Sequence, residues 1–213
     1  MVADRPAPIL AVFTRGCERG RVKSRLARTV GDDAALEAHR ALVGRTLEAA
    51  RRSGLEAEVW LDGAPASLPA HGFAVRAQPT GDLGARMFAV VSDIVARGRA
   101  AIVIGTDCPV LDADYLRRAA RALVDADVVL GPVEDGGYVL IGLHRPYSAL
   151  FDAVPWSTPG VYAETLRRIA AAQLRSVALE TLWDVDTEAD WRRWRRFEGG
   201  GSTPDPRSSR SSR

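Results

Sequence analysis

The chain has 213 residues and a formal net charge of +2, and 46% of its residues are hydrophobic while 26% are charged. This length fits one α/β domain of ordinary size, because single cores stop growing only near about 250–300 residues. The composition excludes a disordered or fibrous protein, and the nearly neutral charge gives no sign of a nucleic-acid partner.

The N-terminus and the two cysteines indicate where the protein resides. The opening sequence MVADRPAPILAVFTR has neither the basic and apolar regions of a signal peptide nor a run long enough to cross a membrane. Cys17 and Cys108 are too far apart for a C-x-x-C pair and do not resemble a disulfide framework. We expect reduced thiols, a cytoplasmic location and no membrane partner.

Apolar runs and helical periodicity alternate along the first half of the chain. Short apolar runs beside turn residues predict strands, and Ala, Leu and Val repeated at helical spacing predict helices. The elements expected there are a strand over 8–14, a helix from Asp32 to Arg52 with Gly54 as its C-cap, strands over 57–63 and 73–78, and a helix from the N-cap Asp82 to Gly98.

The second half continues this alternation with one exception. Its expected elements are a strand over 100–106, a helix over 111–125, strands over 127–133 and 137–143, a helix over 159–172, a strand over 174–180 and a helix over 188–197. The EDGG turn before residue 137 is too short for a crossover helix, so the strand after it should run antiparallel. The other alternations predict a mostly parallel sheet covered on both faces. The Gly-, Ser-, Pro- and Arg-rich segment 199–213 is predicted to be a disordered tail.

Asp107 stands at the end of the most apolar predicted strand, within VIGTDCPVL. Pro109 lacks an N–H and turns the backbone out of the sheet, and ligands of open α/β sheets bind beyond the carboxyl ends of the strands. Asp107 should therefore face this crevice, where a carboxylate suits Mg²⁺ that is bound together with substrate phosphates. The alternative is that Asp107 only caps the turn into the following helix.

A second candidate carboxylate lies near the end of the chain. The sequence LWDVDTEADW places Asp184 and Asp186 just before a predicted helix. Thr187 and Asp190 have a spacing like that of a capping box. Capping does not require Asp186, so a metal-ligand role stays open for it.

The first loop, TRGCERGRVKSRLA, is basic and follows the first strand directly. It is neither a P-loop nor a G-x-G-x-x-G fingerprint. Its glycines, Gly16 and Gly20, permit close approach of the backbone to a ligand. Its positive charges favour phosphate, and they come from Arg15, Arg21, Lys23 and Arg25. We interpret it as a phosphate-binding loop, with an exposed basic loop as the alternative.

Two further segments point to the same crevice. PTGDLGARM leads into the helix that begins at Asp82, whose free N–H groups suit a base, ribose or phosphate. GPVEDGGYVLIG places Asp135, Gly136 and Gly137 at another edge, although the two glycines alone also fit a hairpin turn. Trp156 is a candidate wall for an acceptor pocket.

Other residue patterns give weaker evidence for a functional site. Asp112 and Asp114 mimic a D-x-D motif, but they stand at a predicted helix start, where capping is expected. Ser157 and Cys108 have no His partner evident in the sequence, so nucleophilic catalysis is not expected.

Six motifs taken in order resemble one bacterial family. They are GRVKSRLA, QPTGDLGARM, IGTDCPVL, GPVEDGGYVLIGL, WSTPGVYAET and LWDVDTEAD. The chain is similar to the radical SAM/selenodomain-associated transferases, a glycosyltransferase-like group of the GT-A nucleotide-diphospho-sugar transferase superfamily. This group is similar in turn to guanylyltransferases of the molybdenum-cofactor and 2-phospholactate pathways. The resemblance implies a GT-A-like three-layer α/β/α sandwich with a mixed, mostly parallel sheet over residues 1–198.

The resemblance also implies roles for individual residues. Those expected to bind the nucleotide are Arg15, Gly16, Lys23, Arg25, Gln78, Gly81, Asp82, Gly84 and Arg86. Those expected to border the acceptor are Asp135, Gly136, Gly137, Tyr138 and Trp156. Asp107 and Asp186 would bind Mg²⁺ or Mn²⁺, and the residues expected to carry the catalysis are Lys23, Arg25 and Asp107.

The implied activity is a Mg²⁺-dependent transfer from a nucleoside triphosphate or a nucleotide-sugar to a small-molecule acceptor. Where many GT-A glycosyltransferases have D-x-D, this chain has TDCP, which favours nucleotidyl transfer over sugar transfer. Related proteins have the sequence KTRL where this chain has KSRL, and its serine keeps the hydroxyl group of the threonine. The alternatives are a glycosyltransferase proper and a non-catalytic nucleotide-binding module.

Overall fold

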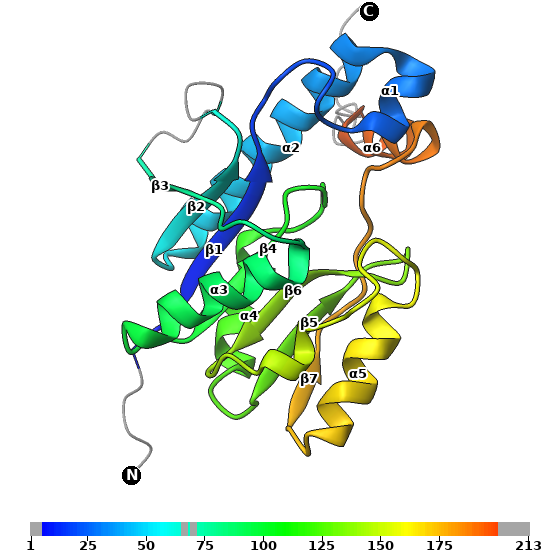
Figure 1. Ribbon diagram of the computed structural model, residues 1–213. Helices are drawn as coiled ribbons and strands as arrows, with labels where there is room; N and C mark the ends of the chain where they lie inside the picture. The colour runs from blue at the N-terminus through cyan, green and yellow to red at the C-terminus, as the bar shows by residue number, and fades with distance from the viewer. Residues whose placement is uncertain (1–5, 65–67, 69–71, 200–213) are drawn as a thin grey trace, which may run out of the picture.

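A seven-stranded mixed sheet forms the middle layer of the protein (Figure 1). The computed structural model describes residues 6–64, 68 and 72–199, so all of the predicted tail except Gly199 lies outside the described residues. The strands, in spatial order, are β3 (Ala74–Ala77), β2 (Ala57–Asp62), β1 (Ile9–Arg15), β4 (Ala101–Ile104), β6 (Tyr138–Leu143), β5 (Val128–Pro132) and β7 (Ser176–Ala178). β6 pairs antiparallel with both of its neighbours and all other pairs are parallel. The predicted mixed α/β sheet and its antiparallel strand are confirmed.

Helices cover both faces of this sheet (Figure 1). The helices of the described residues are α1 (Ser24–Val30), α2 (Asp32–Ser53), α3 (Leu83–Ala96), α4 (Ala113–Ala122), the short 3₁₀ helix η2 (Ser148–Leu150), α5 (Val161–Ala171) and α6 (Glu188–Gly199), of which α1 and α6 lie at one end of the sheet. None of the helices in the described part of the chain is long and apolar enough to span a membrane.

β1 shows how the strands divide their side chains between two cores. Successive strand residues point to opposite faces. Ile9, Ala11 and Phe13 pack with α3 and α5, while Leu10 and Val12 pack with α2 and α4. All five are buried. A strand that is apolar on both faces fits only between two helical layers, which is why the first predicted strand lies near the centre of the sheet.

Helix α1 is absent from the sequence prediction, which treated residues 14–27 as a loop. It has only seven residues and no side-chain hydrogen bond at its N-cap, Lys23. Short helices depend on tertiary packing rather than on propensity. Leu26 provides this packing, because it is fully buried against α2, Trp183 and Trp194 of α6. Figure 1 shows α1 and α6 together at one end of the sheet.

The segment between β7 and α6 links two distant parts of the sheet. Leu179 N donates to Leu130 O of β5 over 2.8 Å, and Leu182 N donates to Pro132 O over 2.9 Å. Beyond β5 the segment moves to the end of β4, where Val185 N donates to Asp107 O over 2.9 Å. This path carries the LWDVD sequence to the carboxyl end of β4.

Candidate functional site

A pocket of about 840 Å³ opens beyond the carboxyl ends of β1 and β4. Ligand sites of open α/β sheets lie in this position. The predicted site residues that line it are Arg15, Lys23, Arg25, Gln78, Arg86, Asp107, Asp135, Gly137, Tyr138, Trp156 and Asp186. Those that do not line it are Gly16, Gly81, Asp82, Gly84 and Gly136. Ligand-binding roles for all of them remain predictions.

Lys23 connects the two candidate metal ligands. Its Nζ lies 2.5 Å from Asp107 Oδ1 and 3.4 Å from Asp186 Oδ1, and it donates to the Val185 carbonyl oxygen over 2.7 Å. The Lys23 side chain is 4% exposed, whereas those of Asp107 and Asp186 are 48% and 42% exposed. The ammonium is therefore held inside the wall, with both carboxylates open toward the pocket.

The charges of this cluster stabilise one another. Burial disfavours the Lys23 ammonium, but the carboxylates of Asp107 and Asp186 outweigh burial and raise the pKa of Lys23. Burial likewise opposes ionisation of Asp107, but the ammonium of Lys23 and its hydrogen bond lower the pKa of that carboxyl. Lys23 and Asp107 accordingly carry their charges at neutral pH.

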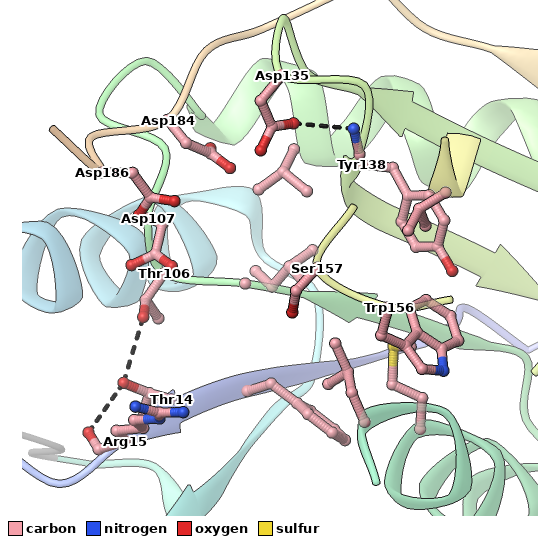
Figure 2. Close-up of a pocket in the computed structure, with 18 of the residues that line it drawn as sticks. Thr14, Arg15, Thr106, Asp107, Asp135, Tyr138, Trp156, Ser157, Asp184 and Asp186 are labelled. Carbon is pink, nitrogen blue, oxygen red and sulfur yellow. Dashed lines mark hydrogen bonds between the residues drawn. The ribbon is translucent and has the colours of Figure 1, made fainter. Parts of the chain in front are cut away.

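The backbone explains why these side chains meet. Lys23 has φ 48° and ψ 46°, a left-handed conformation that turns the chain sharply into α1. Thr106, one residue before Asp107, donates from Oγ1 to Thr14 Oγ1 over 3.2 Å, which joins the ends of β4 and β1 (Figure 2). The Val185–Asp107 backbone hydrogen bond then brings Asp186 to the same place.

Asp184 is a member of the cluster that sequence analysis noted but did not assign. It lines the pocket beside Asp107, Asp135 and Asp186 (Figure 2), and its Oδ1 is buried without a hydrogen-bond partner among the described residues. Burial, followed by the charges of Asp107 and Asp135, raises the pKa of Asp184 well above its usual value. Its only sequence signal was its position two residues before Asp186.

We expect Asp184→Asn to stabilise the protein increasingly as pH rises. The raised pKa means that the folded state keeps the proton at pH values where the unfolded state loses it, so stability falls as pH rises from about 3.9 through the folded pKa. Asn removes this loss because it does not ionise. Urea unfolding of both proteins from pH 4 to 8, in metal-free buffer, measures the effect; a pH-independent difference between them would contradict it.

The carboxylates fit a divalent cation only together with a substrate. Among the residues that the structure describes, no three His, Cys, Asp or Glu side chains are arranged to hold a metal ion. Mg²⁺ usually takes one or two protein carboxylates and completes its shell with phosphates and water. Asp107 and Asp186 already share one cation, the Lys23 ammonium, and the orphaned Asp184 Oδ1 lies in the same cluster. These carboxylate oxygens therefore fit a Mg²⁺ ion that takes its other ligands from substrate phosphates and water.

Arg86 and Gln78 form a polar network at another part of the pocket. Gln78 Nε2 donates to the carbonyl oxygens of Thr14 and Trp60 over 3.2 and 3.0 Å. Arg86 donates from Nη1 to Asp62 Oδ2 over 3.1 Å and to Gln78 Oε1 over 3.3 Å. These side chains are fixed by the ends of β1 and β2, so they present a preorganised polar surface.

The charge of the first loop is divided between the pocket and the surface. Arg21 pairs with Glu18 over 3.1 Å and does not line the pocket, and its binding of phosphate remains a prediction. Arg25 is exposed on α1, with Nη1 3.9 Å from Asp186 Oδ2. Arg15 lines the pocket, where its carbonyl oxygen lies 3.2 Å from His39 Nε2.

Two predicted caps are confirmed and explain residues outside the cluster of Lys23, Asp107, Asp184 and Asp186. Asp82 caps α3, because its Oδ1 accepts from Ala85 N over 2.8 Å. Asp112 caps α4 in the same way, accepting from Tyr115 N over 2.7 Å. Both carboxylates thus satisfy helix N-terminal N–H groups.

The predicted acceptor edge consists of the EDGG turn and Trp156. Asp135 Oδ1 accepts from Gly137 N over 2.8 Å, which fixes the turn beside the pocket. The rings of Tyr138 and Trp156 contact each other edge to face, with centroids 6.3 Å apart. A Cβ at Gly136 would collide with the Pro159 carbonyl group, so glycine allows this turn to pack closely against the loop that carries Trp156.

Gly84 is needed for packing rather than for its backbone freedom. A Cβ on Gly84 would lie 2.5 Å from Trp156 Nε1 and would also overlap the Phe151 carbonyl oxygen. We expect Gly84→Ala to destabilise the protein by about 1–3 kcal/mol through overpacking. The matched control is Gly44→Ala in α2, where a Cβ meets nothing within 4 Å and should stabilise by about 0.4–1 kcal/mol. Urea unfolding measures both; equal effects would contradict the packing role.

A model of a family of uncharacterized proteins conserved in bacteria, DUF2064, matches residues 46–158, more than half of the chain. The chain belongs to this family. The part that matches DUF2064 includes Gln78, Arg86, Asp107 and Asp135, while Lys23 lies before it. No curated protein sequence matches the chain significantly.

Solved structures share the fold of this DUF2064 protein. A protein from Desulfovibrio desulfuricans G20, provisionally described as a nucleotide-diphospho-sugar transferase, is 28% identical, with a TM-score of 0.81 over 95% of this chain and 91% of that chain. CMP:2-keto-3-deoxy-manno-octonic acid synthetase, solved with CTP, is 15% identical, with a TM-score of 0.60 over 92% and 100%. Rv0371c from Mycobacterium tuberculosis H37Rv, solved with manganese, is 18% identical, with a TM-score of 0.54 over 88% and 97%.

Proposed function

We propose that this protein is a divalent-metal-dependent nucleotidyltransferase, which transfers a nucleotidyl group from a nucleoside triphosphate to a small-molecule acceptor. The observation that carries the proposal is the Lys23 ammonium between Asp107 and Asp186 in a pocket at the carboxyl edge of the sheet. The CTP complex of the synthetase and the manganese complex of Rv0371c, on the same fold, support it. The resemblance of six motifs to the radical SAM/selenodomain-associated transferases supports it too.

Mg²⁺ or Mn²⁺ held by Asp107 and Asp186 would neutralise charge on the phosphates. In the proposed reaction an acceptor oxygen forms a bond to the α-phosphorus while the bond to the pyrophosphate oxygen breaks. Such transfers depend on positioning and electrostatic stabilisation more than on covalent chemistry by the protein. Arg15, Lys23 and Arg25 supply positive charge to the phosphates.

The remaining pocket residues would position the two substrates. The network of Gln78 and Arg86 is assigned to the base or ribose, because its side chains are held rigidly at the ends of β1 and β2. The lining residues assigned to the acceptor are Asp135, Gly137, Tyr138 and Trp156.

A thermal-shift screen tests this function directly. Nucleoside triphosphates and nucleotide-sugars are added singly, with and without Mg²⁺ or Mn²⁺, because a ligand that binds the folded state raises the unfolding temperature. We expect a nucleoside triphosphate to give a metal-dependent shift. Stabilisation by nucleotide that ignores the metal would instead identify a non-catalytic binding module.

A glycosyltransferase is the second candidate, favoured by the 28% identity with the provisionally described nucleotide-diphospho-sugar transferase. The products distinguish the two. Pyrophosphate release from a nucleoside triphosphate identifies nucleotidyl transfer, whereas free nucleoside diphosphate from a nucleotide-sugar identifies glycosyl transfer.

A further inference from the structure

Ser157 has a backbone conformation that residues with a Cβ rarely adopt. Its φ is 63°, in the left-handed region. Among the described residues, three other non-glycine residues have positive φ: Lys23, Ala153 and Gln173. Gln173 follows the C-cap of α5, where a left-handed residue commonly ends a helix. The Ala153 carbonyl is held by Arg168 Nη2 over 3.2 Å. Lys23 and Ser157 both line the pocket.

The loop around Ser157 is clamped from two sides, which maintains the strained conformation. On one side, Tyr162 N donates to Gly136 O over 2.9 Å, and the Pro159 carbonyl packs where a Cβ on Gly136 would lie. On the other side, the Trp156 ring fills the space left by the missing side chain of Gly84. Strained backbone persists when its surroundings determine it in this way, and such residues cluster at functional sites.

The Ser157 hydroxyl lies where the polar and apolar parts of the pocket meet. Figure 2 shows Ser157 between Asp107 on one side and Trp156 on the other, with its hydroxyl directed into the space between them. The hydroxyl forms no hydrogen bond with any other residue in the described ranges. The apolar part includes Met87, Trp156 and Leu83, and Leu83 is unusual in being 41% exposed.

We propose that Ser157 binds the acceptor, and that the acceptor carries a flat apolar group beside its reacting polar group. The apolar group lies against Trp156 and Leu83, and the Ser157 hydroxyl hydrogen-bonds the polar group at the boundary. This inference rests on the proposed transferase function, because it assigns the acceptor side of the same pocket. Leu83 supports the apolar contact, since a large exposed hydrophobic side chain inside a concave site gains by being covered.

One aromatic and one aliphatic phosphate serve as probes of this site. Phenyl phosphate has a flat apolar group and glycerol 3-phosphate lacks one, while both carry the same phosphate. Titration calorimetry measures each probe, first alone and then with the nucleotide and metal that the screen identifies. We expect phenyl phosphate to bind at least tenfold more tightly than glycerol 3-phosphate. Equal affinities, or no binding of phenyl phosphate in either condition, would overturn the apolar acceptor.

Two substitutions test the hydroxyl itself. Ser157→Ala removes only the hydroxyl, and Ser157→Gly also relieves the left-handed backbone. Both should weaken phenyl phosphate binding about 3- to 10-fold, the range expected for one hydrogen bond, with nucleotide affinity unchanged and the melting temperature within about 3 °C of the parent. Gln173→Gly, which relaxes a similar backbone strain outside the pocket, should leave both affinities unchanged.

The outcomes separate this inference from the proposed function. Unchanged probe affinity in Ser157→Ala would overturn the role of Ser157, and so would a loss of nucleotide affinity, because it would assign the hydroxyl to the nucleotide. If the parent binds no nucleotide, the proposed function fails. The titrations of phenyl phosphate alone then still decide whether Ser157 and the apolar contact form a binding site.

Discussion

We expect Asp107→Asn to lower the kcat of the proposed reaction by about 10²–10³, the usual effect of removing one preorganised electrostatic group from an active site. The substitution keeps the shape of the side chain and removes a charge that lies 2.5 Å from the Lys23 ammonium and opens toward the pocket. Pyrophosphate release from the nucleoside triphosphate identified by the ligand screen measures it. The metal-dependent part of the thermal shift should disappear as well, because Asp107 is one of the two carboxylates assigned to the cation.

Asp112→Asn is the matched control for this substitution. It makes the same chemical change five residues later, at the N-cap of α4. Asn caps helices about as well as Asp, so activity and stability should both stay close to those of the parent. Turnover that survives in Asp107→Asn, or that falls equally in Asp112→Asn, would rule out the proposed role of Asp107.

Lys23→Met should lower turnover by about 10²–10³ and, at the same time, increase the affinity for Mn²⁺ alone. The ammonium competes with any metal ion for Asp107 and Asp186, its neighbours at 2.5 and 3.4 Å. A unit charge at about 4 Å contributes roughly 1–4 kcal/mol at effective dielectric constants of 80 to 20, so its removal should tighten Mn²⁺ binding about fivefold or more. Electron paramagnetic resonance of free Mn²⁺ measures this affinity.

Arg28→Met provides the control for Lys23→Met. Arg28 is an exposed cation on α1 that does not line the pocket, so Mn²⁺ affinity and turnover should both remain unchanged. Weaker Mn²⁺ binding in Lys23→Met would mean that the carboxylates are not the metal site. Unchanged binding in that variant would mean that Lys23 does not compete with the metal.

The opposite expected signs of these two effects distinguish Lys23 from a structural residue. A lysine that only held the fold together would, when replaced, reduce metal binding and activity in parallel. A lysine that neutralises the carboxylates before substrate arrives, and the phosphates afterwards, has different effects on the two measurements. We expect opposite effects on metal binding and activity, because the Lys23 ammonium lies close to the carboxylates of both Asp107 and Asp186.

The sequence determined the order of the elements and the edge at which ligands bind. Periodicity found each strand of the sheet, and the EDGG turn indicated the antiparallel β6, because the five residues 133–137 between β5 and β6 cannot contain a crossover helix. Asp107 followed from the same local rules, since it comes just after an apolar strand and just before Pro109, and so lies beyond the carboxyl end of β4. These inferences depend on neighbours along the chain.

Only the tertiary structure decided which residues act together. Lys23 and Val185 are 162 residues apart and are joined by one hydrogen bond, and α1 forms because Leu26 is buried by α2 and α6. The raised pKa of Asp184, and the position of Ser157 between polar and apolar walls, arise from packing around them. Burial and electrostatic interaction act through space, so the local pattern of residues contains no signal for them.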